Sequence, residues 1–180
     1  MNDNYDNPDI IVDYITGKSV PNVGAEINRQ QVERYLVEEK GYRHEEILVD
    51  APIQLEIDGE IYRSTVDLVV QIDNRPLMVV KCAAGSLGSR EREAVSAARL
   101  FGASPMPLAV VSDGTTATVL DTTKGKQKGK GLEAIPHRNE ALERVQSEPL
   151  PPIAPERLIR ERLVFRSYDS MNVNVQRKED

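Results

Sequence analysis

The sequence is poor in the residues that build disulfides and zinc sites. Its 180 residues contain one cysteine, Cys82, and two histidines, His44 and His137, which lie far apart in the chain. A single cysteine excludes an intrachain disulfide and suits a reducing compartment such as the cytoplasm. Two separated histidines do not support a His/Cys zinc cluster. Any metal ion would have to be held by carboxylates, as magnesium is.

The sequence also lacks the features of membrane, exported and base-stacking proteins. No apolar run approaches the roughly 20 residues of a membrane helix, and the polar N-terminus MNDNYDNPD has no signal-peptide pattern. Aromatic residues make up 4% of the chain, too few for a ladder on which nucleic-acid bases stack. The formal net charge of −6 argues against a generic nucleic-acid binder, although local patches count for more than the sum. We therefore expect a cytoplasmic domain with no membrane partner.

The hydrophobic periodicity predicts a mixed α/β domain with a twisted sheet flanked by helices. Residues 53–57 and 61–72 lie on either side of Asp58-Gly59, and this pattern predicts a β-hairpin. The apolar run 76–84 predicts a strand in mid-sheet. A helix over 90–101, capped by Ser89, would then cross over to a parallel strand at 107–112. The other predicted elements are helices at 22–40, 138–147 and 156–166, a strand at 115–121, and a short helix or turn at 8–16.

We expect one domain over residues 1–149, with its core at about 20–125 and disorder at 1–7, followed by an extension over 150–180. The extension consists of the proline linker LPPIAP, a helix and a polar tail. Its helix, residues 155–166, is predicted either to dock on a protein partner or a second copy, or to pack back on its own sheet.

The segment 123–131 is a lysine- and glycine-rich stretch that we expect to be a loop. Its four cations, Lys124, Lys126, Lys128 and Lys130, form the one concentrated basic patch of the chain. Such a loop could wrap a nucleic-acid phosphate backbone. The alternative is a solvated hairpin connection with no ligand.

The order of these elements and a set of short motifs together match a known pattern. The motifs are Glu26, Arg29-Gln30, Gly41-Tyr42, Asp67, Pro76-Leu77 and the run Val110-Val111-Ser112-Asp113-Gly114. The pattern resembles the N-terminal nuclease domain of type I restriction enzyme R subunits, which belongs to the PD-(D/E)xK nucleases. The resemblance covers roughly residues 20 to 125 and implies an α/β restriction-endonuclease-like fold. The chain has no GxxxxGK[ST] phosphate loop, so no helicase motor is predicted in it.

The resemblance also implies a site, and the sequence departs from the family pattern at its centre. In the family, acids on neighbouring strands hold magnesium, and a lysine two residues after the second acid orients the attacking water. Lys81 stands where the second acid is expected, and Ala83 stands where the lysine is expected. The glutamine and tyrosine usual on the crossover helix are missing from residues 93–99 as well. The implied catalytic site of Glu26, Asp67 and Lys81 is therefore vestigial, and we expect it to bind no cofactor. If the site is active, we expect Asp67 and Glu26 to bind magnesium.

A buried ammonium group requires a carboxylate partner. We therefore predict that Lys81 forms an ion pair with Asp67, with Glu26, or with both. A rival alignment keeps Lys81 as the catalytic lysine and leaves the two acids as a weak metal site. A third interpretation makes Asp67 and Glu26 ordinary surface charges. Cys82, which has apolar neighbours, is predicted to be a buried core residue and not a reactive thiol.

Three classes of function remain open. The first is a catalytically inactive nuclease-fold module of a restriction-type system that binds DNA or mediates assembly. Its predicted nucleic-acid contacts are the four lysines together with Arg29 and Arg90; the alternative for Arg90 is an ion pair with a neighbouring glutamate. The second is an active magnesium-dependent endodeoxyribonuclease with a rearranged site. The third is a structural or interaction protein without a nucleic-acid role, which the acidic net charge favours.

Overall fold

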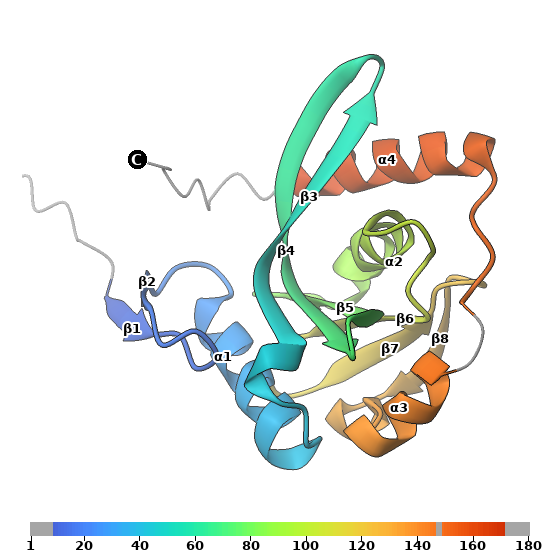
Figure 1. Ribbon diagram of the computed structural model, residues 1–180. Coiled ribbons are helices and arrows are strands. Elements are labelled where there is room, and N and C mark those ends of the chain that lie inside the picture. The colour runs from blue at the N-terminus through green and yellow to red at the C-terminus, as the bar shows by residue number, and fades with distance from the viewer. Residues whose placement is uncertain (1–8, 147–148, 172–180) are drawn as a thin grey trace, which may run out of the picture.

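The structure is a computed structural model that describes residues 9–146 and 149–171. Six strands form one mixed sheet in the order β3-β4-β5-β6-β7-β8, in which only β5 and β6 run parallel (Figure 1). The predicted mixed α/β architecture is confirmed. The segment 1–7, which we predicted to be disordered, and most of the polar tail lie outside the described residues.

The two long strands at one edge of the sheet form the predicted hairpin. β3 (Ile47–Ile57) and β4 (Glu60–Ile72) are antiparallel and turn at Asp58-Gly59, where both residues have positive φ. Asp-Gly suits this turn because both residues tolerate the left-handed region. The tip of the hairpin projects beyond the sheet as a two-stranded arm beside α4 (Figure 1).

The centre of the sheet is the predicted crossover unit. β5 (Arg75–Cys82) leads through α2 (Glu91–Leu100) into the parallel strand β6 (Leu108–Ser112). Ser89 does not cap the helix as we predicted. A 3₁₀ turn, Gly88–Arg90, precedes α2, and the Ser89 hydroxyl donates to the carbonyl of Ser86.

Two further predictions of local structure differ from the structure. The segment 123–131 is not a loop throughout, because β8 (Lys126–Lys130) pairs with β7 (Ala117–Asp121) and forms an edge of the sheet. Near the N-terminus, the expected helix or turn at 8–16 is a strand followed by a turn at 14–16, and together with a second strand it forms a two-stranded hairpin. Its strands are β1 (Ile10–Val12) and β2 (Ser19–Pro21), and its turn is closed by Asp13, which accepts hydrogen bonds from Thr16.

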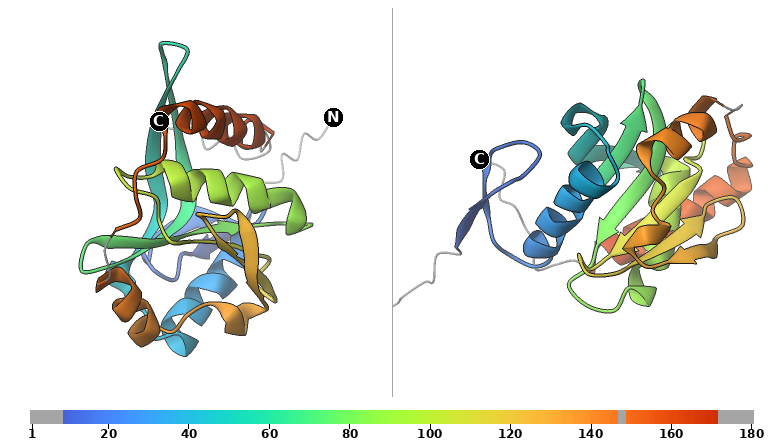
Figure 2. Two further views of the ribbon diagram at one scale, coloured as in Figure 1. Left: turned by 90° about the vertical axis from the view of Figure 1, so that its right-hand side faces the viewer. Right: turned by 90° about the horizontal axis from the view of Figure 1, so that it is seen from below.

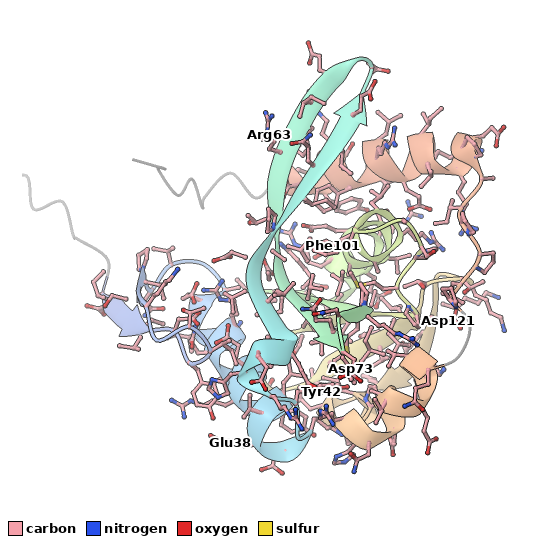
Figure 3. The ribbon with its side chains drawn as sticks, in the orientation of Figure 1. Glu38, Tyr42, Arg63, Asp73, Phe101 and Asp121 are labelled. Atoms are coloured by element: carbon pink, nitrogen blue, oxygen red, sulfur yellow. The ribbon has the colours of Figure 1, made fainter. Side chains whose placement is uncertain are left out.

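Helices cover both faces of the sheet (Figure 2). On one face lie α3 (Arg138–Gln146) and α1 (Glu26–Arg34), which continues through a π-helical turn, Tyr35–Glu39. On the other face lies α2, and α4 (Pro155–Asp169) packs outside it and against β3. The buried hydroxyl of Tyr42, labelled in Figure 3, donates to the carbonyl of Pro136 and ties the end of the α1 segment to the approach to α3.

Each face of the sheet has its own apolar core, as alternating strand side chains require. In β5, Val80 and Cys82 face α1 and α3, whereas Val79 and Ala83 lie in the core under α2. Lys81 has the same parity as Val79 and Ala83, so its side chain faces α2. Within the residues that the structure describes, no helix has the length and apolar character needed to cross a membrane.

Candidate active site

Lys81 and Asp67 are brought together by the register of the two central strands. Leu68 of β4 pairs with Val80 of β5, which places Asp67 opposite Lys81 across the ladder. The Lys81 Nζ lies 3.3 Å from Asp67 Oδ1. The second oxygen of the same carboxylate accepts a hydrogen bond of 2.7 Å from the backbone N–H of Cys82. The predicted ion pair between Lys81 and Asp67 is therefore present.

A second carboxylate holds Lys81 from the crossover helix. Glu93 Oε1 lies 3.2 Å from Lys81 Nζ, and its other oxygen lies 3.2 Å from Arg90 Nη1. Glu93 is almost completely buried, with 2% of its surface exposed. The sequence alone did not identify Glu93 as a partner of Lys81. A usable signal was its position on an otherwise small and apolar helix face, where a carboxylate requires a cation.

The surroundings of Lys81 keep it charged. Burial by itself lowers the pKa of the Lys81 amine, but Asp67 and Glu93 outweigh burial and raise the pKa above its usual value. The hollow beside the amine is lined by Thr65, Val66, Phe165 and residues of β5 and α2, and its volume is about 10 Å³. That volume accommodates roughly one water molecule.

This arrangement does not fit a magnesium ion. Magnesium takes about six oxygen ligands in a near-octahedral shell, whereas the two carboxylates here already share a fixed ammonium group. A dication at the same carboxylates would lie within a few ångströms of that ammonium and would be repelled by it. Across residues 9–146 and 149–171, no group of three or more histidine, cysteine, aspartate or glutamate side chains is placed to hold a metal ion.

Glu26 belongs to a second charged cluster, centred on Arg29. Arg29 is 3% exposed, and its guanidinium lies 2.5 Å from Glu26, 2.9 Å from Asp50 and 3.2 Å from Asp13. The side-chain amide of Gln30 donates to both Glu26 and Asp13. Burial lowers the pKa of Arg29, but the carboxylates, led by Asp50 and Glu26, raise it overall.

The two charged clusters adjoin through the β3–β4 ladder. Asp50 stands between the register pairs Val49–Leu68 and Ala51–Val66, which places it opposite Asp67. Its φ of 49° marks an irregular position in the strand, where the side chain reaches Arg29. The residues that the sequence singled out, Glu26, Asp67 and Lys81, therefore lie in one region but in two separate sets of ion pairs.

Glu33 adds a fully buried carboxyl group to the Arg29 cluster. It lies 3.6 Å from Arg29 Nε. Burial, followed by the nearby Asp13, raises the pKa of Glu33 to about 8, although Arg29 opposes the rise. The raised pKa favours the protonated form of Glu33 at neutral pH, and a neutral carboxyl limits the negative charge around Arg29.

The predicted nucleic-acid contacts differ in accessibility. Arg29 is buried and enclosed by carboxylates, so its guanidinium is not available to a nucleic-acid phosphate in this structure. The function proposed below therefore does not include a contact between Arg29 and DNA. Arg90 is partly exposed and forms the alternative ion pair, with Glu93. The four lysines are exposed at or beside β8.

The two residues after Lys81 are buried. Burial raises the pKa of the Cys82 thiol well above its usual value, and Asp67 adds to this effect. A thiol with a raised pKa is a poor nucleophile, as predicted for a core residue. Ala83, at the position where the family has lysine, is 3% exposed, and its carbonyl accepts a hydrogen bond from the Asn28 side chain at 2.7 Å.

Comparison with known proteins supports the resemblance seen in the sequence. No curated protein and no solved structure matches the chain. A family model described as type I restriction enzyme R protein N terminus (HSDR_N) matches residues 24–136. This range runs from the start of α1 to the approach to α3 and contains the Lys81 cluster and most of the Arg29 cluster. Since it covers more than half of the chain, the protein belongs to the family of type I restriction enzyme R protein N-terminal domains.

Proposed function

We propose that this domain is a restriction-system module that has lost the ability to cut DNA and that contributes DNA binding or assembly instead. The observation that carries the proposal is the Lys81 ammonium, 3.3 Å from Asp67 and 3.2 Å from Glu93. It stands at the position where the family pattern has an acid. A fixed ammonium group supplies a single positive charge in place of a bound dication, and it offers no metal-bound water molecule to attack a phosphate.

The surface that best suits a DNA contact in this proposal is the basic edge strand. Lys124, Lys126, Lys128 and Lys130 are exposed along one edge of the sheet, and the sequence offers no aromatic platform for stacking bases. Contacts of this kind favour backbone binding with strong salt dependence and little sequence preference. Lysines on an edge strand also block edge-to-edge pairing of sheets, so the DNA role requires its own test.

The first experiment tests cutting. Supercoiled plasmid is incubated with the protein and magnesium or manganese, beside an Asp67→Ala variant. We expect no nicking or linear product above the level of the variant. Cutting that depends on Asp67 would overturn the proposal and would favour the rearranged active nuclease.

The second experiment tests DNA binding. Retention of a short duplex is measured over a series of salt concentrations for the wild type and for a variant with all four lysines of the basic edge replaced by glutamine. We expect weaker retention and a shallower salt dependence for the variant, by roughly one unit of slope for each phosphate that the variant no longer binds. Replacing the exposed Lys18 and Arg34, which lie away from the basic edge, by glutamine is a control for loss of positive charge elsewhere and should leave retention nearly unchanged. No retention by the wild type would leave assembly as the remaining role.

A further inference from the structure

A buried polar network fixes the rotation of α4 about its own axis. The Glu161 carboxylate accepts hydrogen bonds from Arg99 Nη1 at 2.6 Å and from Ser96 Oγ at 2.7 Å. Arg99 also donates from Nε to the carbonyl of Thr122 at 2.8 Å. Glu161 is 8% exposed, and Phe165, one turn further along, is 2% exposed. Because breaking a buried pair leaves an uncompensated charge, α4 has to present this face to α2.

The same rotation turns two large aliphatic side chains into solvent. Ile159 and Leu163 are four residues apart and share one face of the helix. They are 58% and 45% exposed. The neighbouring core is apolar, and a helix free to roll could bury them. The Glu161 network prevents this, so the outward apolar stripe, Ile159 and Leu163, is a fixed feature of the fold.

A groove runs between this outward stripe and the turn of the β3–β4 hairpin. Its volume is about 190 Å³, and its lining comprises Ile159, Arg162 and Leu163 of α4 together with residues 56–59. Figure 1 shows the hairpin tip beside α4. The groove offers room for a large aliphatic side chain from another molecule.

Cations surround the outward stripe on the helix. Arg160 and Arg166 are exposed, and Arg162 lines the groove. Arg162 Nη1 donates to the carbonyl of Glu56 at 3.1 Å. Its Nε is buried, and no acceptor for it is found in the part of the chain that the structure describes. A buried donor without an acceptor is costly.

The charge pattern distinguishes between occupants. A second copy pairing through the outward stripe would set Arg160 and Arg162 of one chain beside the same residues of the other, because both arginines lie next to the midpoint of the stripe. Like charges in contact oppose such a dimer. DNA would match the arginines but would leave the two aliphatic side chains without an apolar partner.

We propose that the outward stripe and its groove are a docking surface for an acidic amphipathic helix of another protein. Such a helix places an aliphatic side chain in the groove and carboxylates opposite Arg160 and Arg162. This is the helix-in-groove mode, in which apolar anchors one turn apart give affinity and flanking charges select the partner. The inference does not depend on whether the domain cuts or binds DNA.

The test uses the whole 180-residue protein and a labelled synthetic helix with leucines at i, i+3 and i+7 and glutamates at the flanking positions. Binding is followed by fluorescence anisotropy. We expect the Ile159→Gln/Leu163→Gln variant to bind at least roughly tenfold more weakly, as loss of central apolar anchors does. Arg160→Glu should also weaken binding and reduce its salt dependence.

Ile61→Gln is the matched control. Ile61 is 48% exposed on the arm, two residues before Arg63, which Figure 3 labels. It pairs with Glu56, so its side chain lies on the face opposite Ile57, which is buried. The control should bind the peptide as the wild type does, and all variants should keep the wild-type melting temperature within about 2 °C.

Five outcomes would overturn the proposal. One is equal binding of a lysine version of the peptide, and a second is equal loss of binding in the Ile61 control. A third is competition by duplex DNA that requires Ile159 and Leu163. The fourth is sedimentation of the free protein as a dimer that the Ile159/Leu163 variant abolishes. The absence of peptide binding up to about 1 mM would also refute it.

Discussion

Replacing Lys81 by methionine removes the ammonium group and keeps most of the side-chain volume. The change leaves the carboxylates of Asp67 and Glu93 without the cation that lies 3.3 Å and 3.2 Å from them. Removing one partner of a buried ion pair costs about 3–5 kcal/mol. Lys81 and Asp67 retain side-chain exposures of 14% and 24%, and Glu93 retains Arg90, so we expect a smaller cost. We set it at about 2–4 kcal/mol of unfolding free energy.

The measurement is urea unfolding together with thermal melting. A cost of about 2–4 kcal/mol corresponds to a drop in melting temperature of roughly 4–16 °C for a chain of this size. The triple variant Lys81→Met/Asp67→Asn/Glu93→Gln removes all three charges and should recover most of the loss, since a neutral isostere of a buried ion pair is often as stable. Asparagine at 67 still accepts the hydrogen bond from the Cys82 N–H.

Two results would refute this reasoning. If Lys81→Met unfolds like the wild type, Lys81 does not balance the two carboxylates. If the triple variant is less stable than the single variant, the cost does not arise from unpaired carboxylates.

Three further changes test other parts of the structure. Glu33→Gln should flatten the pH dependence of stability. The pKa of this carboxyl is about 8 in the folded state and near 4.5 in the unfolded state. The wild type should therefore lose up to roughly 1.4 kcal/mol of unfolding free energy per pH unit as the pH rises between those values. The unfolding free energy is measured by urea titration between acidic and neutral pH. The same change of unfolding free energy with pH in the wild type and the variant would contradict this. Gly114→Ala should cost about 1–3 kcal/mol, because Gly114 has a φ of 87° and an added Cβ would meet the Gln31 side-chain oxygen at 2.2 Å; an unchanged melting temperature would rule this out. Magnesium at several times its dissociation constant should stabilise the Lys81→Glu variant by about 1 kcal/mol. It should not stabilise the wild type. Equal stabilisation of both proteins would argue against Lys81 as a substitute for the metal.

The parts of the fold that the sequence predicted are those in which local chemistry and packing agree. Asp58-Gly59 suits a tight turn between alternating strands, and the run 76–84 is apolar on both faces as a central strand must be. The crossover from β5 to β6 follows from the alternation of strand, helix and strand.

The missed elements have side chains that give little information. β8 consists of lysine, glutamine and glycine, its side chains are mainly exposed, and backbone pairing with β7 holds it in place. The amino-acid composition of β8 therefore resembles that of a loop. β1 and β2 are three residues each, too short for a period-two pattern to be read.

The sequence predicted one ion pair of the candidate site, Lys81 with Asp67, but not the other partners of these charges. Asp67 and Lys81 meet because strand register places them opposite each other. The family resemblance and the need of a buried ammonium group for a carboxylate allowed this pair to be anticipated. Glu26 was expected near the same amine, but Arg29 is three residues away on the same helix and binds it. The contacts of Arg29 with Asp13 and Asp50 depend on the N-terminal turn and on an irregular strand position, neither of which has a sequence signal that we could use.

The position of Cys82 gives the protein a built-in reporter. It is the sole thiol of the chain, it is buried, and its backbone N–H is bonded to Asp67. A thiol-reactive dye should therefore modify the molecule only when the strand carrying Lys81 loosens. The labelling rate thus measures how often the centre of the sheet opens, and a cysteine engineered onto the outer surface could be tagged selectively under native conditions.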